Sequence, residues 1–342
     1  MSYSQPNDGT SNTKQPGAYL LHMRNSQRWT KTSHAIKLVA CGFFVLGDYA
    51  IQSALAQQSG GFPPTPVEQP VTFRGESKFC NIVNKAKENN WRALPIGELM
   101  GKIADMLEGT PYVASTLELS PDVELCSANL DELDCVTFFE TTLGLARMIK
   151  KGGETQKDLL AEIQLTRYRG GSVGDYASRL HYTSDWLADN ESKQTVEVLS
   201  KLPGAEKFPQ KVNFMSSHPA SYKQLAAHPE LVKKIKQREN EINARTLMYV
   251  PLDKVADAEA HLQTGDIVGI CTNVPGLDIS HTGLVIRDKD GVPHFMDASS
   301  QKKNMKVTLE PGPISKYMTE SNERSQKIIG LVFARPLEPK AQ

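Results

Sequence analysis

The 342-residue sequence has no excess of charge of either sign and no recognisable metal-binding motif. Lys and Arg together number 39, as do Asp and Glu, so we expect no basic surface for nucleic acid. No CxxC pair occurs, and no two histidines are spaced i and i+4, which argues against a structural zinc site. The sequence therefore predicts no metal, no cofactor and no nucleic-acid partner.

Cysteine is scarce as well, with five residues in the whole chain and four beyond its amino-terminal region. Four cysteines in so long a chain do not make a disulfide scaffold. One disulfide among Cys80, Cys126 and Cys271 is compatible with the sequence, but the spacing does not select the pair. Cys135 differs from these three because it directly follows Asp134, at the predicted start of a helix.

Long hydrophobic runs are missing except for residues 38–46. Basic residues precede this run and Ala54-Leu55-Ala56 follows it, which is typical of a secretory signal with a small-x-small cleavage site. A membrane anchor fits less well, because Asp48 follows the run and about 20 apolar residues are needed to span a bilayer. Lipoprotein attachment at Cys41 is the alternative. We expect residues 1–56 to be an upstream tail and signal peptide, and the mature protein to be exported to the periplasm without stable membrane insertion.

Two helices are predicted in the first half of the chain. Apolar residues at helical spacing indicate one over 96–107, which Gly109 ends. A second is predicted from Cys135 to about residue 149, with Asp134 as its N-cap and two lysines followed by two glycines at its end. Apolar residues spread round most of its surface, so we expect this helix to be central and buried.

The domain organisation follows from the order of these signals. Residues 57–75 are linker-like, and 154–246 are mixed and more helical, with a charged amphipathic helix at about 229–245. From residue 247 the signals change to strands, over 267–271, 280–286 and 293–298. Helices followed by antiparallel strands predict an α+β fold, as one domain over 76–340 with a helical insertion at about 154–246.

Cys135 and His281 are the candidate catalytic pair. A thiol in the first turn of a helix is close to the positive end of the helix dipole, which favours the thiolate, and nearby backbone N–H groups can hold an oxyanion. His281 lies on a strand rich in β-branched residues, before Gly283, which leaves room for a close neighbour. A neutral imidazole there can take the thiol proton and later hand it to a leaving amine.

The third catalytic position is Asp297 or His294. If Lys289-Asp290-Gly291 forms a three-residue hairpin loop with the glycine in the left-handed conformation, residues of equal parity share a face across the two strands. Asp297 then lies on the face of His281, and His294 on the other face. A loop of two or four residues would reverse this assignment. A carboxylate beside the imidazole fixes its tautomer, and we favour Asp297.

Several segments together resemble a known family. They are Gly109-Thr110-Pro111-Tyr112, Leu133-Asp134-Cys135-Val136-Thr137-Phe138, Gly265-Asp266-Ile267-Val268 and Ser280-His281-Thr282-Gly283. They are similar to the NlpC-type, papain-like cell-wall cysteine hydrolases. Further segments narrow the resemblance to the N-acetylmuramoyl-L-alanine amidase-like branch, over roughly residues 76–336; these are Arg167-Tyr168-Arg169-Gly170-Gly171, Arg179-Leu180-His181-Tyr182, residues 276–281 and Asp297-Ala298-Ser299-Ser300.

The resemblance implies a papain-like fold, with the helix that carries Cys135 packed on a curved antiparallel sheet. It also implies hydrolysis of the bond between the muramic acid lactyl group and L-alanine, in peptidoglycan fragments such as anhydro-muropeptides. Cys135 is then the nucleophile, His281 the base, and Tyr112 the tyrosine that lines the site. The third position is usually His in this group, whereas Asp297 occupies it here.

Residues of the insertion are candidates for binding substrate, because arginine forks bind the carboxylates of muropeptides and aromatic faces stack on sugar rings. Asp278 is a further candidate, as an acceptor for ligand amides. The predicted substrate-binding residues, with Tyr112, are Arg167, Tyr168, Arg179, His181, Tyr182, Trp186 and Asp278.

Three other functions remain open at this point. One is an endopeptidase that cuts between γ-D-glutamate and the diamino acid of the same substrates. Another is a peptidoglycan-binding module without turnover, which the presence of Cys135 and His281 disfavours. The last is an acyltransferase with the same dyad, which would need an acceptor site that excludes water.

Overall fold

Helices come first and antiparallel strands second in the computed structural model, which describes residues 72–302 and 304–340. The helices are α1 Glu76–Glu88, α2 Ile96–Leu107, α3 Cys135–Lys151, α4 Gln156–Arg167, α5 Thr183–Ser192, α6 Phe214–Ser217, α7 Lys223–Ala227, α8 Glu230–Asn243, α9 Val255–Ala258 and α10 Ile314–Ser325. The strands are β1 Phe73–Arg74, β2 Ala128–Asn129, β3 Val196–Val198, β4 Glu206–Lys207, β5 Met248–Pro251, β6 Ile267–Thr272, β7 Ile279–Arg287, β8 Pro293–Ser299, β9 Lys306–Leu309 and β10 Ile328–Pro336.

One sheet contains eight of these strands, in the order β4-β5-β10-β6-β7-β8-β9, with β3 also paired to β10. Every pairing in it is antiparallel, whereas β1 and β2 form a separate parallel pair. The last strand of the chain, β10, lies between β5 and β6 rather than at an edge. The structure therefore confirms the predicted combination of helices with an antiparallel sheet.

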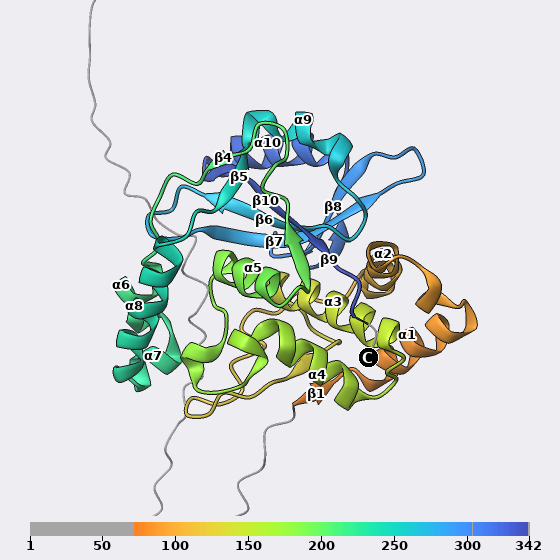
Figure 1. Cartoon of the computed structure of the whole chain (residues 1–342), viewed down its shortest axis with the longest axis horizontal. Coiled ribbons are helices and arrows are strands. Elements are labelled where there is room, and N and C mark those ends of the chain that lie inside the picture. The colour runs from red at the N-terminus through yellow and green to blue at the C-terminus, as the bar shows by residue number, and fades with distance from the viewer. Residues whose placement is uncertain (1–71, 303, 341–342) are drawn as a thin grey trace, which may run out of the picture. The chain divides into compact units, whose positions relative to one another are not determined.

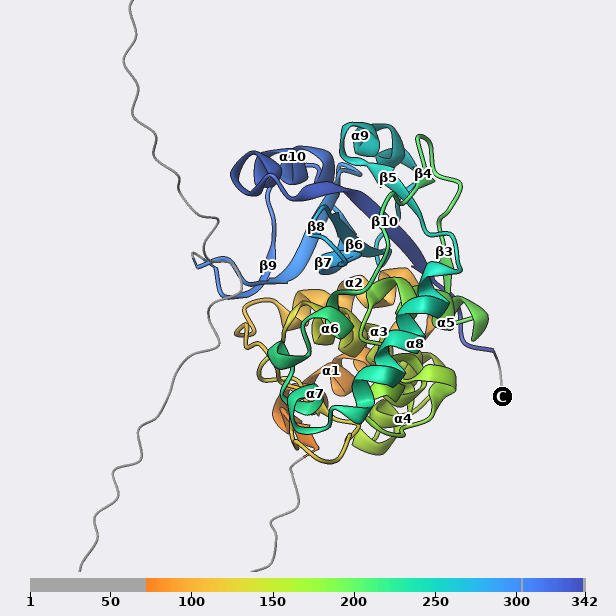
Figure 2. The same cartoon turned by 90° about the vertical axis from the view of Figure 1, so that its left-hand side faces the viewer.

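Helices cover both faces of the large sheet (Figures 1 and 2). On one face α2 and α3 pack in a core that includes Leu143, Leu284 and Met296. On the other face α9 and α10 pack over Val285 and Phe295. A third, smaller core joins α8 to the segment around Tyr176. Neighbouring residues of β7 and β8 thus face different cores, as the alternation of a strand requires.

The predicted helices lie where the apolar periodicity placed them. Helix α2 spans Ile96–Leu107, and Gly109 follows with a left-handed φ of 80°. Helix α3 begins at Cys135 and ends before Gly152, whose φ is 81°. All its residues from 137 to 149 are buried, which confirms that this helix is central. The amphipathic helix predicted at 229–245 is α8.

The segment from 154 to 246, predicted to be mixed and more helical, holds five α-helices, three short 3-10 helices and two short strands. The expected signal peptide, its cleavage site and Cys41 lie outside the described residues. Within the described residues all four cysteines are free, so none of the three candidate disulfide pairs forms. No helix in residues 72–302 or 304–340 is both long and apolar enough to cross a membrane.

Candidate active site

Cys135 is the first residue of α3, and the cap of this helix fixes its position. The Asp134 carboxylate accepts a hydrogen bond from the Thr137 backbone N–H at 2.8 Å, and the Thr137 hydroxyl accepts one from the Asp134 N–H at 2.8 Å. This reciprocal cap satisfies two of the four N–H groups that a helix leaves open at its start. Cys135 itself is half-buried, at the start of a helix whose residues 137 to 149 are buried.

His281 lies at the start of β7, directly after an irregularity in the strand. Ile270 of β6 pairs with His281, but the next residue, Cys271, pairs with Ile279, so Ser280 is an extra residue on β7. Such a bulge bends a strand and increases its twist, and bulges of this kind often lie next to active sites. Here the bulge immediately precedes His281, whose side chain is 19% exposed.

The imidazole connects Cys135 with Asp297. Its Nε2 lies 2.6 Å from Asp297 Oδ2, and a side-chain hydrogen bond links the ring to the Cys135 thiol. Burial alone lowers the pKa of His281, but the charge of Cys135, the hydrogen bonds to both partners and the charge of Asp297 together raise it well above its ordinary range. The surroundings of the ring therefore favour the protonated form of the His281 imidazole.

The hairpin between β7 and β8 decides which residue accompanies His281. The Asp288 backbone N–H donates to the Val292 carbonyl at 3.0 Å, which leaves residues 289–291 as the loop. The backbone of Gly291 is in the left-handed conformation, with φ 77°. The register pairs Val285 with Phe295 and Leu284 with Met296, so Asp297 shares the face of His281. His294 lies on the other face, where Asp288 and the Glu310 carbonyl contact its ring. The predicted loop and its parity are confirmed.

Tyr112 lies beside this group. Its backbone N–H donates to the Met305 carbonyl at 2.9 Å, and it forms a parallel bridge with Leu133, two residues before Cys135. Burial, followed by the charges of Cys135, Asp134 and Asp297, raises the pKa of the Tyr112 phenol. The phenol therefore stays protonated and can donate a hydrogen bond next to the thiol.

Thr282 has a role at this site that the sequence did not indicate. Its Oγ1 donates to the backbone carbonyl of Cys135 at 2.9 Å, and the residue is 1% exposed. The only signal in the sequence was its position next to His281. Position 283 has no room for a side chain, because a Cβ there would lie 2.4 Å from the Met296 carbonyl oxygen and 2.5 Å from the Phe295 ring.

Four of the predicted substrate-binding residues are buried and bonded to the protein itself. Arg167 donates to Glu140 of α3 at 2.7 Å, and Trp186 donates to the other oxygen of the same carboxylate at 3.0 Å. Tyr168 donates to Glu124 at 2.9 Å, and Asp278 accepts from the Ser184 N–H at 2.9 Å. Each is at most 2% exposed, so internal partners take the place of the substrate contacts expected from the sequence.

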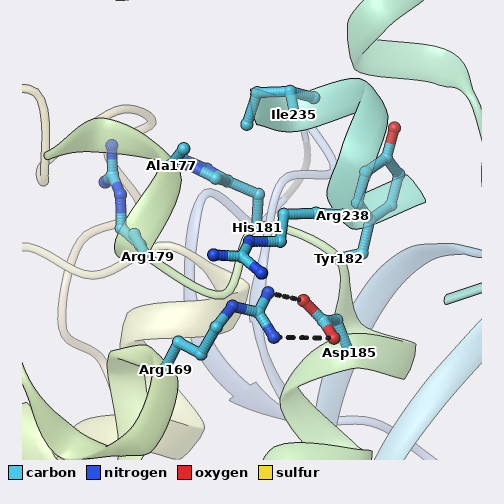
Figure 3. Close-up of a pocket in the computed structure, with 8 residues that line it drawn as sticks. All are labelled: Arg169, Ala177, Arg179, His181, Tyr182, Asp185, Ile235 and Arg238. Atoms are coloured by element: carbon cyan, nitrogen blue, oxygen red, sulfur yellow. Dashed lines mark hydrogen bonds and ion pairs between the residues drawn. The ribbon is translucent and has the colours of Figure 1, made fainter. Parts of the chain in front are cut away.

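The remaining three, Arg179, His181 and Tyr182, line a pocket between η3 (Tyr176–Ser178), α5 and α8 (Figure 3). Arg179 also pairs with Glu118 at 2.8 Å and with Glu124 at 3.2 Å. Tyr182 donates to Glu239 at 2.8 Å. Neither Cys135, His281, Asp297 nor Tyr112 lines this pocket. The predicted residues thus divide into a compact group around Cys135, an internal network and a separate pocket.

Comparison with known proteins shows which family the chain resembles. A family model described as N-acetylmuramoyl-L-alanine amidase-like matches residues 102–324. A crystal structure of an N-acetylmuramoyl-L-alanine amidase from Bacteroides uniformis is 32% identical, with a TM-score of 0.64, over 71% of this chain and 99% of that one. No curated protein matches the chain.

Two further solved structures are similar. A Bacteroides fragilis protein named as a xylanase candidate is 34% identical, with a TM-score of 0.61, over 68% of this chain and 98% of its own. A Legionella pneumophila protein is 19% identical, with a TM-score of 0.58, over 78% and 96% of the two chains, and shows a shared fold alone.

Proposed function

The chain belongs to the N-acetylmuramoyl-L-alanine amidase-like family, and from this we propose that it is a cysteine amidase that hydrolyses the amide bond between N-acetylmuramic acid and L-alanine in peptidoglycan fragments. The observation that carries the proposal is the chain of contacts from Cys135 through His281 to Asp297. The fold would then be of the papain-like, NlpC type, with the nucleophile at the start of a buried helix.

The reaction begins at the thiolate of Cys135, which attacks the lactyl carbonyl carbon of the muramic acid. The negative charge that develops on the carbonyl oxygen needs hydrogen-bond donors. In the first turn of α3 the N–H groups of Asp134 and Thr137 are taken by the cap, which leaves those of Cys135 and Val136 for this role. The protonated phenol of Tyr112 is a further donor beside the thiol.

His281 supplies and recovers the proton. The imidazolium donates its proton to the L-alanine nitrogen as the C–N bond breaks, so the peptide leaves as an amine and the lactyl group stays on sulfur as a thioester. The neutral imidazole then removes a proton from water, which attacks the thioester and releases the carboxylic acid and the thiolate. Asp297 holds Nε2 throughout, so that Nδ1 faces the sulfur.

Purified protein incubated with N-acetylmuramoyl tripeptide, and products weighed by mass spectrometry, tests this function. We expect release of an intact tripeptide that begins with L-alanine, and no turnover by Cys135→Ala. Cys80→Ala is the matched control, since Cys80 is an exposed cysteine of α1. Release of L-alanyl-γ-D-glutamate joined to the sugar would instead identify an endopeptidase, and binding without turnover a non-catalytic module.

We also propose that the protein is exported, on the basis of the basic start, short apolar run and small-x-small site of residues 24–56. Mass analysis of the protein recovered from a bacterial host tests this. Periplasmic protein cleaved after Ala56 is expected. A lipid-modified amino end at Cys41, or an uncleaved chain in the cytoplasm, would contradict it.

A further inference from the structure

Two segments of the chain lie side by side next to Cys135. The Leu133 backbone N–H donates to the Pro111 carbonyl at 3.0 Å, and the Val113 N–H donates to the Leu133 carbonyl at 3.0 Å. These bonds form the parallel bridge of Tyr112 with Leu133. A single bridge fixes the two segments at one point, so the angle at which they run past one another depends on contacts elsewhere along them.

Lys78 bonds the same two segments at a second point. Its Nζ donates to Thr110 Oγ1 at 2.8 Å and to the Leu130 carbonyl at 2.8 Å. Thr110 is two residues before Tyr112, and Leu130 is three residues before Leu133. Both acceptor residues are buried, with exposed fractions of 3% and 0%. One ammonium group therefore connects the segment that leads to Tyr112 with the segment that leads to α3.

Main-chain contacts at the start of α1 place Lys78 against Leu130. The Leu130 backbone N–H donates to the Arg74 carbonyl at 3.1 Å. Gly75 follows in the left-handed conformation with φ 87°, and a Cβ there would lie 2.7 Å from the Leu130 Cβ. Helix α1 therefore starts in direct contact with Leu130, and Lys78 lies in its first turn.

A cation at this place is unfavourable for α1 itself. The N-terminal end of a helix dipole is positive, and Lys78 occupies the first turn. Burial lowers the pKa of Lys78, although the charge of Asp131 opposes this shift, so the ammonium group also loses part of its hydration. Its charge-assisted bonds to Thr110 and Leu130 offset these costs, and such bonds are about twice as strong as bonds between neutral groups. Lys78 therefore stabilises the two segments rather than its own helix.

We propose that Lys78 is a positioning residue that holds the Tyr112 phenol beside the Cys135 thiol. It does so by fixing residues 110–113 against residues 130–135. With the ammonium bonds and the backbone bridge both in place, the segments cannot pivot about the bridge. Without Lys78, a pivot moves the phenol away from the carbonyl oxygen that it would bind in the transition state. The inference rests on the proposed function, because it takes Tyr112 as a donor to the oxyanion.

Steady-state kinetics with N-acetylmuramoyl tripeptide test this role in two backgrounds. Lys78→Met keeps the length of the side chain and removes the ammonium group. We expect kcat about tenfold lower with KM little changed, because a small misplacement of a donor affects the transition state. In the Tyr112→Phe background, itself about 100-fold slower, Lys78→Met should have almost no further effect, since the donor that it misplaces is already gone. Lys87→Met is the matched control on the same helix, because its ammonium pairs with Glu154 and is 51% exposed.

Substitutions of Thr110 test the same contact from the other side, and they decide the question if Lys78→Met does not fold. Thr110→Val removes one acceptor of the ammonium group and keeps the branched shape of the side chain. We expect it to lower kcat with KM little changed, and Thr110→Ser to restore kcat. A loss that serine does not restore would show that packing at position 110 matters, and not the bond to Lys78.

Hydrogen exchange separates this inference from the proposed function, because it needs no turnover. The Val113 and Leu133 amides that form the bridge should exchange about tenfold faster in Lys78→Met than in Lys87→Met, while the amides of β6 keep their rates. Equal losses of kcat in the two Tyr112 backgrounds, or an unaltered kcat in Lys78→Met or in Tyr112→Phe, would overturn the proposal. If the unmodified protein cleaves no muropeptide, the amidase proposal fails, and the exchange rates alone decide whether Lys78 holds the two segments.

Discussion

Thr282 Oγ1 donates a hydrogen bond to the backbone carbonyl of Cys135, so the strand that carries the proposed base, His281, is bonded to the proposed nucleophile. His281 and Thr282 are consecutive and point to opposite sides of β7. One therefore contacts the Cys135 side chain and the other its main chain. The separation of sulfur and imidazole is set by both contacts together.

Thr282→Val should lower kcat with little change in KM, because it removes this hydrogen bond and keeps the shape of the side chain. A misplacement of about 1 Å can cost about 100-fold in rate, so we expect a loss of about 10- to 100-fold. The rate of Cys135 alkylation by iodoacetamide as a function of pH should change in parallel. Thr282→Ser should restore both, whereas Thr319→Val on α10, whose exposed hydroxyl likewise donates to a backbone carbonyl, should leave both unaltered. An unchanged alkylation profile would show that Thr282 has only a packing role.

Asp297→Asn should lower activity and shift its pH dependence. The carboxylate helps to raise the pKa of His281, so its loss lowers that pKa, and the alkaline limb of kcat/KM should move to lower pH. A loss of about 100-fold in rate is expected. His294→Gln is the control, since its ring lies on the other face of the hairpin. A larger effect of His294→Gln than of Asp297→Asn would reverse the assignment of the third residue.

Asp297→Asn should also lower the free energy of unfolding, by an amount that depends on pH. A histidine whose pKa is raised on folding stabilises the protein fully below its ordinary pKa of about 6.5, and this contribution is lost as the pH rises through the folded value. Asp297→Asn should therefore reduce the free energy of unfolding more at pH 6 than at pH 10. Denaturant titrations of the two proteins at both pH values measure the difference. A deficit that grows with pH would contradict the direction of the shift.

Arg167→Met should destabilise the protein strongly, because it leaves the Glu140 carboxylate buried without its cation. Both partners are at most 2% exposed, and breaking such a pair costs about 3–5 kcal/mol in the free energy of unfolding. Lys87→Met is the control, since its pair with Glu154 is about half exposed and is expected to contribute at most about 1 kcal/mol. Equal effects in urea titrations would show that the internal pair is not a major contributor.

Gly283→Ala should reduce both stability and activity. Its Cβ would meet the Met296 carbonyl and the Phe295 ring, and overpacking of this kind costs about 1–3 kcal/mol. Since Gly283 is two residues from His281, a shift of β7 would also displace the imidazole. Gly174→Ala in an exposed loop is the control, and thermal unfolding with kcat measures both effects. Unaltered unfolding would mean that β7 and β8 can separate at no cost.

The placement of Cys135, His281 and Asp297 was predictable because it depends on local signals. The cap at Asp134 and the apolar periodicity after it place Cys135 at a helix start, and the loop that ends at Gly291 sets the register that brings Asp297 to His281. The bulge at Ser280 could not be predicted, since it depends on how β6 and β7 pair rather than on either sequence alone.

The surroundings of the residues predicted to bind substrate were harder to predict, because their residue types fit two environments. An arginine or tryptophan can bind a ligand at the surface or satisfy a buried acid, and Arg167 and Trp186 do the latter through Glu140. Glu140 is a charged residue on an otherwise apolar helix, so its need for internal partners was the available signal. Arg238, in contrast, was part of an ordinary amphipathic pattern, and only the folded chain brings it to Arg169.

The position of β10 makes the Cys135 site depend on a segment that is distant from it in sequence. This strand follows all the other strands described, yet it lies between β5 and β6 and supports the strand that pairs with β7. A chain cut before residue 328 would still contain Cys135, His281 and Asp297, but it would lack the centre of the sheet that holds the latter two in place. We therefore expect such a shortened chain to be inactive.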